Sequence, residues 1–541
     1  MKAVFNSKNK LYIAICIAML FISISIMAIY CSGDDIYGDE VFSIGFANNT
    51  ELLFLTPGGM ERHAVGGWIS GDYIRSYYAV DEGESFNLIG CVRQARDDVH
   101  PPLYFMLLNA FSSFAPGKAT PFPGHLINVI ACTVLLVIIY LISLKITHDR
   151  IKSFIPVIIM LGTPALETEV TYIRMYAPLC AILLIYMYLC MLLTDKKYDR
   201  RPLYIILGLT TTIGTLTHYY YYIMCFFTAL TATMILLKQK RIKSFIKFFI
   251  SQLIGAVISF AAYPYVFRHM LHSERGEQAF ENLGSTDKGF YLEHLKRFAR
   301  TYNTELFNGH FFIYAVIIII MSVCASAVLI KNSKDKTDNV LNKNSMKDAL
   351  ILIVPSLLYW CTLFKISYST RWLYISPTFA PIILVLSLIF LWAVQTVFSK
   401  KSNAILFIIA IIVCTSYLVI SIPERVKMRD LLSSRMDIIK STSDDRDCLF
   451  IYDEWSNPHY GRDLELINYD QIKFLSMDEL YTTDLVSVFE NRTSKDNDLA
   501  VYIRTSIPDA QHVSEYIYEA FDGKDIKLIA DDGFYIYNID R

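Results

Sequence analysis

The pair Asp39-Glu40 is the first place in this chain where acid–base chemistry is conceivable. Both carboxyls stand a few residues after an apolar run, and an apolar segment at residues 41–44 follows them. An acid held at the edge of an apolar environment loses part of its hydration, which raises its basicity toward a hydroxyl. A carboxylate pair can also hold a divalent cation. The ten other acids of residues 32–100 are typical of a solvated loop, so the pair is a candidate base or cation site.

A histidine and two prolines, His100-Pro101-Pro102, open a second motif at the end of the same acid-rich loop. Proline fixes the backbone and restricts the residue before it, so this stretch is stiff where the chain leaves water for an apolar segment. We interpret His100 as a positioning or donor-contacting residue.

Two acids, Glu167 and Glu169, are expected with Arg174 in the next short outer loop, around 167–174, with Tyr176 beside them. Charges at the mouth of a helical bundle are costly unless they are paired or solvated, so a binding function is one interpretation. An ordinary interfacial Arg–Glu pair with aromatic anchors is equally compatible with the spacing.

Further along, His218 and Tyr219 stand at a helix–helix turn, and Arg371 opens a late apolar run. A guanidinium at headgroup depth can grip a phosphate through two parallel hydrogen bonds. Snorkelling cations and interfacial tyrosines are the common alternative. Residues 268–310 add Arg275 and other cations.

Apolar runs of bilayer length must position these residues. The 541 residues are 54% hydrophobic, which excludes an ordinary soluble enzyme and predicts a helical membrane protein. We read the first run as a retained helix. The expected spans are 11–31, 124–146, 152–166, 175–194, 203–217, 219–237, 246–267, 311–331, 349–364, 372–395 and 404–422.

The apolar stretch 102–116 is short for a crossing, and the charges of the loops decide its place. If it does not cross, five basic loops fall on the side of the basic N-terminus, as the positive-inside rule requires. The N-terminus is then cytoplasmic. The first outer loop 32–123 and residues 423–541 lie outside the plasma membrane.

Residues 423–541 change character. Short β-prone runs (449–452, 472–475, 499–503, 526–529 and 534–537) alternate with polar turns and one helical stretch, 511–521. We therefore expect a membrane domain, 1–422, and a small extracytoplasmic α/β domain, 423–541. The membrane domain is all-α, with about eleven spans plus juxtamembrane helices in its first outer loop.

Several motifs together resemble the GT-C superfamily of integral-membrane glycosyltransferases, in particular bacterial relatives of protein O-mannosyltransferase and of the lipid A aminoarabinose transferase. They are Asp39-Glu40, His100-Pro101-Pro102-Leu103-Tyr104, Arg174-Met175-Tyr176, Thr217-His218-Tyr219-Tyr220 and Arg371-Trp372-Leu373-Tyr374. Their order and spacing are far more specific than any one of them.

The resemblance implies transfer of a sugar from a polyprenyl-phosphate-linked donor to an acceptor on the outer face, by inverting single displacement. It implies Asp39 as base with Glu40 beside it, a further acid at Glu167 or Glu169, and contact of Arg371 with the lipid phosphate. Donor-binding residues would be His100, Glu167, Glu169, Arg174, Tyr176, His218, Tyr219 and Arg371. Some members use a divalent cation (Mg²⁺ or Mn²⁺), for which Asp39 and Glu167 are the expected ligands.

Other classes of function stay open. A transporter or flippase predicts ionisable residues deep in the spans and internal repeats, whereas the charges here stand at helix ends. A glycan ligase or polymerase acting on lipid-linked glycans would use the same outer-face site. The acceptor is a glycan, a lipid or a protein, the membrane lipids are partners, and we expect no nucleic acid partner.

Overall fold

The computed structural model describes most of the chain. The described residues are 7–32, 36, 38–49, 67–286, 288–332, 343–366, 371–398, 402–442, 446–452, 462–490, 498–504, 510–531 and 534–539. They divide into two compact units. The first unit comprises Met1–Cys31, Asp98–Tyr104 and His125–Glu424, and the second comprises Ser32–Asp97, Phe105–Gly124 and Arg425–Arg541. The boundary between a membrane domain and a C-terminal domain at residue 423 stays a prediction.

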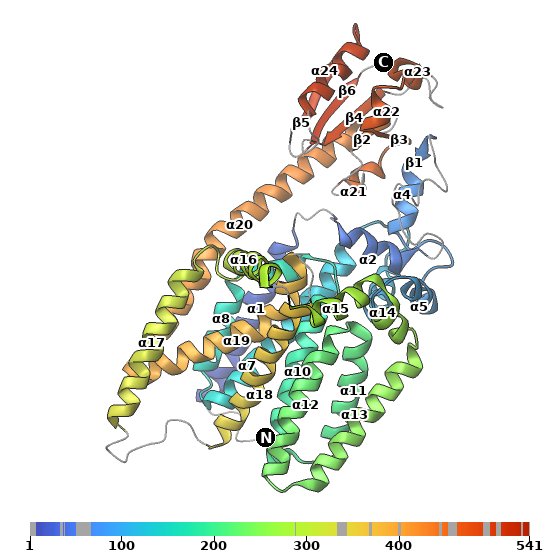
Figure 1. The fold of residues 1–541 in the computed structure, drawn as a ribbon. Helices are drawn as coiled ribbons and strands as arrows, with labels where there is room; N and C mark the ends of the chain where they lie inside the picture. The colour runs from blue at the N-terminus through green and yellow to red at the C-terminus, as the bar shows by residue number, and fades with distance from the viewer. Residues whose placement is uncertain are drawn as a thin grey trace. The chain divides into compact units, whose positions relative to one another are not determined.

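The first unit is a bundle of long apolar helices (Figure 1). Nine helices among the described residues are long and apolar enough to cross a membrane, which makes the chain a multi-pass membrane protein. They are α1 (Ser7–Tyr30), α7 (Phe122–Thr147), α10 (Tyr176–Thr194), α12 (Tyr220–Lys238), α13 (Ile242–Ala262), α17 (Phe311–Asn332), α18 (Lys343–Ile366), α19 (Arg371–Phe398) and α20 (Ser402–Thr442). The helix α11 (Arg201–Thr217) coincides with the expected span 203–217, but at 17 residues it is not one of these nine.

A bent pair of helices takes the place of the expected span 152–166. The 3-10 helix η2 (Lys152–Phe154) and α8 (Ile155–Leu161) are followed, after a bend of 67°, by α9 (Pro164–Thr171). The break follows from the sequence, because the Thr163 side chain caps α9 by accepting a hydrogen bond from the Leu166 amide at 3.3 Å, and Pro164 is its first residue. Counted as one span, the pair brings the candidates to ten.

The core of the bundle lies around α10 and α19, whose most apolar windows are 72% and 78% buried, whereas α17 buries only 6%. The helices α11, α12 and α13 lie side by side (Figure 1). Glycines let α11 and α13 approach closely, since a Cβ on Gly255 would stand 2.4 Å from the Gly208 carbonyl oxygen.

Polar side chains fasten one end of these three helices. The Asp199 carboxylate accepts hydrogen bonds from Arg241 Nη2 at 2.8 Å and from Ser244 Oγ at 2.6 Å, and its other oxygen accepts one from Tyr204 at 2.5 Å. Burial acts to raise the pKa of Asp199, but these hydrogen bonds and the Arg241 charge outweigh it and lower the pKa to about 2. The basic loop that begins near Lys238 is thus anchored to the bundle.

Three further helices follow α13: α14 (Val266–His272), α15 (Glu274–Gly284) and α16 (Lys288–Glu305). Phe298 and Tyr302 of α16 are buried, and Phe298 packs edge-on against Trp360 of α18 with ring centroids 5.2 Å apart. The region 268–310 is therefore helical and packs on the bundle through one face of α16.

The second unit contains the short helices of the first loop, α2 (Asp39–Asn48), α4 (Gly71–Tyr78) and α5 (Leu88–Asp97). The helix α6 (Leu103–Ser112) begins directly after the two prolines. Ten helical residues extend about 15 Å, half the thickness of the hydrocarbon core, so α6 cannot cross a bilayer by itself. The prediction that 102–116 does not form a spanning helix is confirmed, and the position of α6 at the membrane surface stays a prediction.

The C-terminal region forms the small α/β fold that the sequence predicts. Its strands are β2 (Arg446–Tyr452), β3 (Gln471–Ser476), β4 (Asp498–Arg504), β5 (Ile526–Asp531) and β6 (Phe534–Ile539). Its helices are α21 (Asp463–Leu466), α22 (Met477–Leu480), α23 (Leu485–Glu490) and α24 (Ala510–Ala520). Strands β3, β2 and β4 are parallel, and β6 and β5 extend the sheet antiparallel.

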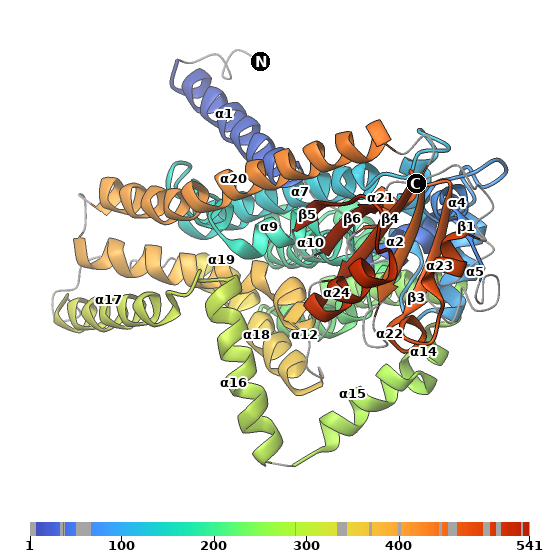
Figure 2. The same ribbon diagram turned by 90° about the horizontal axis from the view of Figure 1, so that it is seen from above.

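One strand of this sheet comes from the first loop. The short β1 (Ile69–Ser70) pairs antiparallel with β3, which gives the order β1-β3-β2-β4-β6-β5. On one face of the sheet, Val501 and Ile503 pack with Val513 and Ile517 of α24 (Figure 2).

Candidate functional site

A chain of three buried polar side chains forms at the start of α10. His100 is 7% exposed and Arg174 is 4% exposed. The His100 Nδ1 atom lies 2.8 Å from Asp98 Oδ2, and Arg174 Nη2 lies 3.4 Å from His100 Nε2. A guanidinium can only donate, so Nε2 is the acceptor and Nδ1 carries the proton that it donates to Asp98. The contacts thus fix the tautomer of a neutral imidazole.

The charges around this chain favour the same protonation state. Burial acts to raise the pKa of Asp98, but His100 and the Arg174 charge outweigh it, so the pKa lies below its ordinary value and the carboxylate is ionised. Burial lowers the pKa of His100. The Asp98 carboxylate opposes this effect, but the positive charge of Arg174 adds to that of burial, and the pKa lies below its ordinary value. His100 therefore stays neutral between an anion and a cation.

His218 joins this cluster from the turn between α11 and α12. Its Nδ1 accepts a hydrogen bond from the Tyr220 amide at 3.0 Å, so the neutral ring carries its proton on Nε2 and can donate it. Its ring centroid lies 6.0 Å from that of His100, 5.4 Å from Tyr176 and 4.6 Å from Tyr220. The sequence-predicted residues His100, Arg174, Tyr176 and His218 are thus brought together.

Positive charges act on both imidazoles of this cluster. Burial lowers the pKa of His218 well below its ordinary value, and His100 and the charges of Arg174 and Arg275 lower it further. Arg275 is an exposed residue of α15 whose charge also acts on His100. A phosphate is a group that a guanidinium and an imidazole N–H group can both bind.

Tyr219 is the other residue of this turn that the sequence predicts to contact the donor, and its hydroxyl contacts α14. Its hydroxyl bonds to His269 Nδ1 of α14 at 2.7 Å. His269 also packs edge-on against Tyr263, with ring centroids 5.8 Å apart. Tyr219 therefore attaches the 266–272 helix to the turn that carries His218.

The structure places the acids Glu167 and Glu169 within the helix α9 and not in a short outer loop, so that part of the sequence prediction is wrong. The reason is the capped start of α9 at Thr163 and Pro164. Glu167 Oε2 accepts hydrogen bonds from the hydroxyls of Tyr417 and Ser421 on α20.

Glu169 is still more deeply enclosed. It is 1% exposed, and its side chain faces Ser376 of α19. Buried acids inside a membrane bundle are costly unless hydrogen bonds satisfy them. Glu167 connects α9 to α20 through its two hydroxyl donors, whereas the Glu169 Oε1 atom has no hydrogen-bond partner among the described residues.

The cation held by Asp39 and Glu167 stays a prediction. Glu167 receives two hydroxyl donors in this structure. Within the described parts of the chain, no group of three or more His, Cys, Asp or Glu side chains is arranged to hold a metal.

Asp39 and Glu40 open α2 in the second unit. Glu40 is 5% exposed and Asp39 is partly exposed, which leaves Asp39 accessible to a reactant. Gly38 precedes them with φ 51°, a conformation that favours glycine. Acids in the first turn of a helix are stabilised by its dipole.

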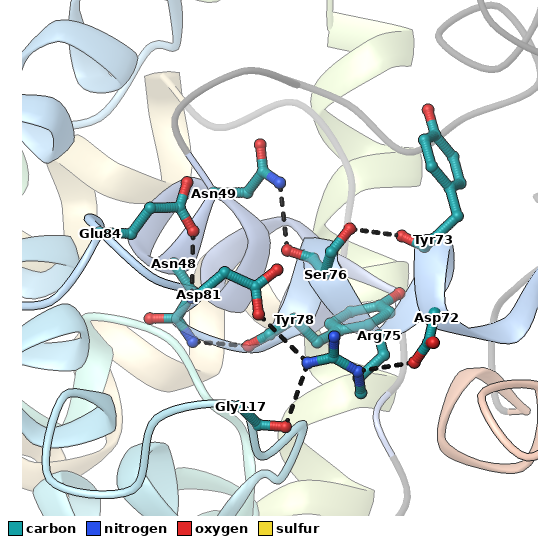
Figure 3. Close-up of polar contacts among 10 residues, drawn as sticks. All are labelled: Asn48, Asn49, Asp72, Tyr73, Arg75, Ser76, Tyr78, Asp81, Glu84 and Gly117. Carbon is teal, nitrogen blue, oxygen red and sulfur yellow. Dashed lines mark hydrogen bonds and ion pairs between the residues drawn. The ribbon is translucent and has the colours of Figure 1, made fainter.

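A polar network holds α2 against α4 (Figure 3). At the C-terminal end of α2, Asn48 Nδ2 donates to the Tyr78 carbonyl at 2.7 Å, and Asn49 Nδ2 donates to the Ser76 carbonyl at 3.1 Å. Arg75 of α4 bonds to Asp81 and to the Gly117 carbonyl, each within 3.2 Å. Of these residues, only Asp81 is one of the acids that are typical of a solvated loop in the sequence.

Arg371 begins α19, but its side chain lies outside the part of the chain that is described. Its contact with a lipid phosphate stays a prediction. Asp98 also belongs to the cluster, although its sequence context is typical of a solvated acid. Its position directly after α5 and two residues before His100 is the feature of the sequence that indicates a contact with His100.

No protein-family model and no curated protein matches the sequence. Among solved structures, the chain is similar to ArnT from Cupriavidus metallidurans bound to undecaprenyl phosphate, at 9% identity over 97% of this chain and 98% of that chain, with a TM-score of 0.47. ArnT from the same organism in the apo state is 10% identical over 98% and 97% of the two chains, with a TM-score of 0.45.

The arabinosyltransferase EmbB from Mycobacterium smegmatis is 11% identical over 95% of this chain but only 45% of its own length, with a TM-score of 0.39. At such low sequence identities, the function of this chain has to follow from its own residues.

Proposed function

We propose that this chain is a membrane glycosyltransferase that takes its sugar from a polyprenyl-phosphate-linked donor. The observation that carries the proposal is the buried chain Asp98–His100–Arg174 with His218 beside it. It is a hydrogen-bonded group at the ends of apolar helices, in which Arg174 and the Nε2–H group of His218 are donors. A lipid that carries a phosphate and a sugar is the class of ligand that matches both properties.

The proposed reaction is a single displacement. The acceptor oxygen attacks the anomeric carbon while the bond from that carbon to the phosphate oxygen breaks, and the bonding electrons leave with the phosphate. The hydroxyl proton goes to the Asp39 carboxylate. Arg174 and the Nε2–H group of His218 stabilise the charge that develops on the phosphate oxygens. No step requires a metal ion.

Aromatic side chains suit the sugar part of such a donor. The rings of Tyr172 and Tyr176 stack with centroids 6.3 Å apart and an interplanar angle of 11°, and Tyr176 flanks His218. A tyrosine has an apolar ring face and a polar hydroxyl, which match the apolar face and the hydroxyl groups of a sugar ring.

A panel of polyprenyl-phosphate sugars, incubated with the purified chain in nanodiscs, tests the proposal. We expect transfer from at least one donor. Asp39→Asn should abolish it, and Arg174→Ala should lower kcat/KM by roughly a hundredfold, whereas Arg174→Lys should recover only part of it because lysine lacks the fork geometry.

Glu82→Gln changes an exposed acid of the same loop and serves as the matched control. A chelator arm tests the divalent cation, since loss of transfer that Mg²⁺ or Mn²⁺ restores would establish the metal. Lipid movement across the bilayer without any transfer would instead favour a flippase. No transfer from any donor, or full activity of Asp39→Asn, overturns the proposal.

A further inference from the structure

We propose that the C-terminal sheet positions the first loop for catalysis, with Trp68 and Gly71 as the residues that couple them. This inference rests on the proposed role of Asp39 as base. It assigns to the C-terminal region a function in the same reaction, through contacts that all lie within the second unit.

The first contact is a shared strand. Ile69 pairs with Ile472 and Ser70 with Gln471, so β1 covers the edge of β3. Ile69 is 9% exposed and Ile472 is fully buried. An edge strand exposes unpaired backbone groups that recruit another strand, and here the recruited strand belongs to the loop of Asp39.

The second contact requires a glycine. The Gly71 amide donates to the Tyr469 carbonyl at 3.1 Å. A Cβ at residue 71 would stand 2.4 Å from that oxygen and 2.8 Å from the Ile467 carbonyl oxygen. Both obstacles are backbone atoms, which cannot rotate away, so any side chain at residue 71 pushes β1 off the sheet.

The third contact is hydrophobic. Trp68 is half-buried and packs against the core of the C-terminal sheet, which includes Leu475 and Leu480. An indole contributes more buried apolar area than any other side chain, so it anchors a two-residue strand that would be weak alone.

From this strand the coupling continues into α4. The Ser70 side chain caps α4 by accepting a hydrogen bond from the Tyr73 amide at 3.2 Å. The strand therefore fixes the start of α4, and Arg75, one turn later, bonds to Asp72 at 3.0 Å and to Asp81 at 3.1 Å.

The last step links α4 to the helix that opens with Asp39. Tyr77 of α4 lies so close to α2 that a Cβ on Gly45 would stand 2.0 Å from its ring. Asn48 and Asn49 complete the connection through their bonds to α4 carbonyls (Figure 3). A displacement of β1 is thus passed through packed helices to α2.

Gly71→Ala tests the inference, with Gly67→Ala as the matched control because a Cβ at Gly67 meets nothing within 4 Å. Hydrogen exchange is measured in nanodiscs. We expect Gly71→Ala to speed exchange of the α2 amides by about tenfold, while β4 and α24 keep their protection. Trp68→Ala should act in the same direction, and Gly67→Ala should change nothing.

Transfer kinetics supply the second readout. We expect Gly71→Ala to lower kcat by about tenfold with little change in KM for the donor, because the base is misplaced while the phosphate cluster is intact. A disulfide between Ile69→Cys and Ile472→Cys, which pair across the two strands and leave the Ser70 cap intact, should restore both kcat and α2 protection when introduced into Gly71→Ala.

Unchanged hydrogen exchange of the α2 amides in Gly71→Ala overturns the inference. A loss of kcat that persists after the disulfide between β1 and β3 has formed overturns it as well. A wild-type protein that transfers no sugar contradicts the proposed function instead. The exchange experiment still decides the coupling in that case, since it needs no substrate.

Discussion

At the scale of single residues, Arg174 sets the protonation of its neighbours. Its guanidinium can only donate, so the facing nitrogen of His100 stays unprotonated and His100 cannot act as the base. Burial lowers the pKa of His218, and the charge of Arg174 lowers it further, while its Nε2–H group can donate to a ligand. The residue with the most conspicuous sequence motif, His100, is therefore a positioning residue for Arg174.

The lowered pKa of His218 predicts a pH dependence of stability. The folded state keeps this imidazole neutral, whereas the unfolded chain binds a proton below about pH 6.5. Stability is therefore fully present above that pH and falls as the pH drops toward the lower pKa of the folded state.

Thermal unfolding in nanodiscs between pH 5 and pH 8 measures this effect. His218→Asn keeps an acceptor for the Tyr220 amide but does not titrate, so we expect a flatter profile. His512→Asn changes an exposed histidine of α24 and should leave the slope unchanged. An unchanged slope in His218→Asn would contradict the prediction.

At the scale of elements, the bend between α8 and α9 places Glu167 and Glu169 inside the helical bundle. The sequence marks the break by Gly162, Thr163 and Pro164, but hydropathy alone continues the span to residue 166. Because the capped helix α9 turns back into the bundle, Glu167 meets α20 and Glu169 faces α19. These contacts give Glu167 a structural function, and its role as a metal ligand stays a prediction.

This assignment predicts the effect of removing the hydroxyl donors. Tyr417→Phe combined with Ser421→Ala removes two hydrogen bonds to a buried carboxylate, each worth about 1.5–3 kcal/mol. We expect a lower unfolding temperature with no change in the response to chelator. Thr415→Ala alters a hydroxyl on the same helix that bonds only to its own backbone, and it should have a small effect.

At the scale of the whole molecule, the charges of the loops predict the orientation in the membrane. Alkaline phosphatase fused after Arg541 should be active, because that end is expected outside, and the same enzyme fused after Lys240 in the basic loop should be inactive. The reverse pattern would place the cluster around Arg174 on the cytoplasmic side and would refute the proposed outer-face reaction.

The sequence by itself determined the membrane helices, the short non-spanning helix α6 and the strands of the C-terminal sheet. These features depend on local hydropathy, charge and periodicity, which neighbouring residues determine. It also indicated His100, Arg174 and His218 as members of a site, through motifs that are spread over more than a hundred residues.

Only the tertiary structure decided how these residues divide their functions. Asp98 looked like one more solvated acid until folding placed it in a buried hydrogen bond with His100. Glu167 looked like a loop acid until α20 supplied its partners, and residues 69–70 had no strand signal before β3 offered an edge. The physical reason is that burial, pairing and edge addition depend on residues distant in the sequence, whereas hydropathy does not.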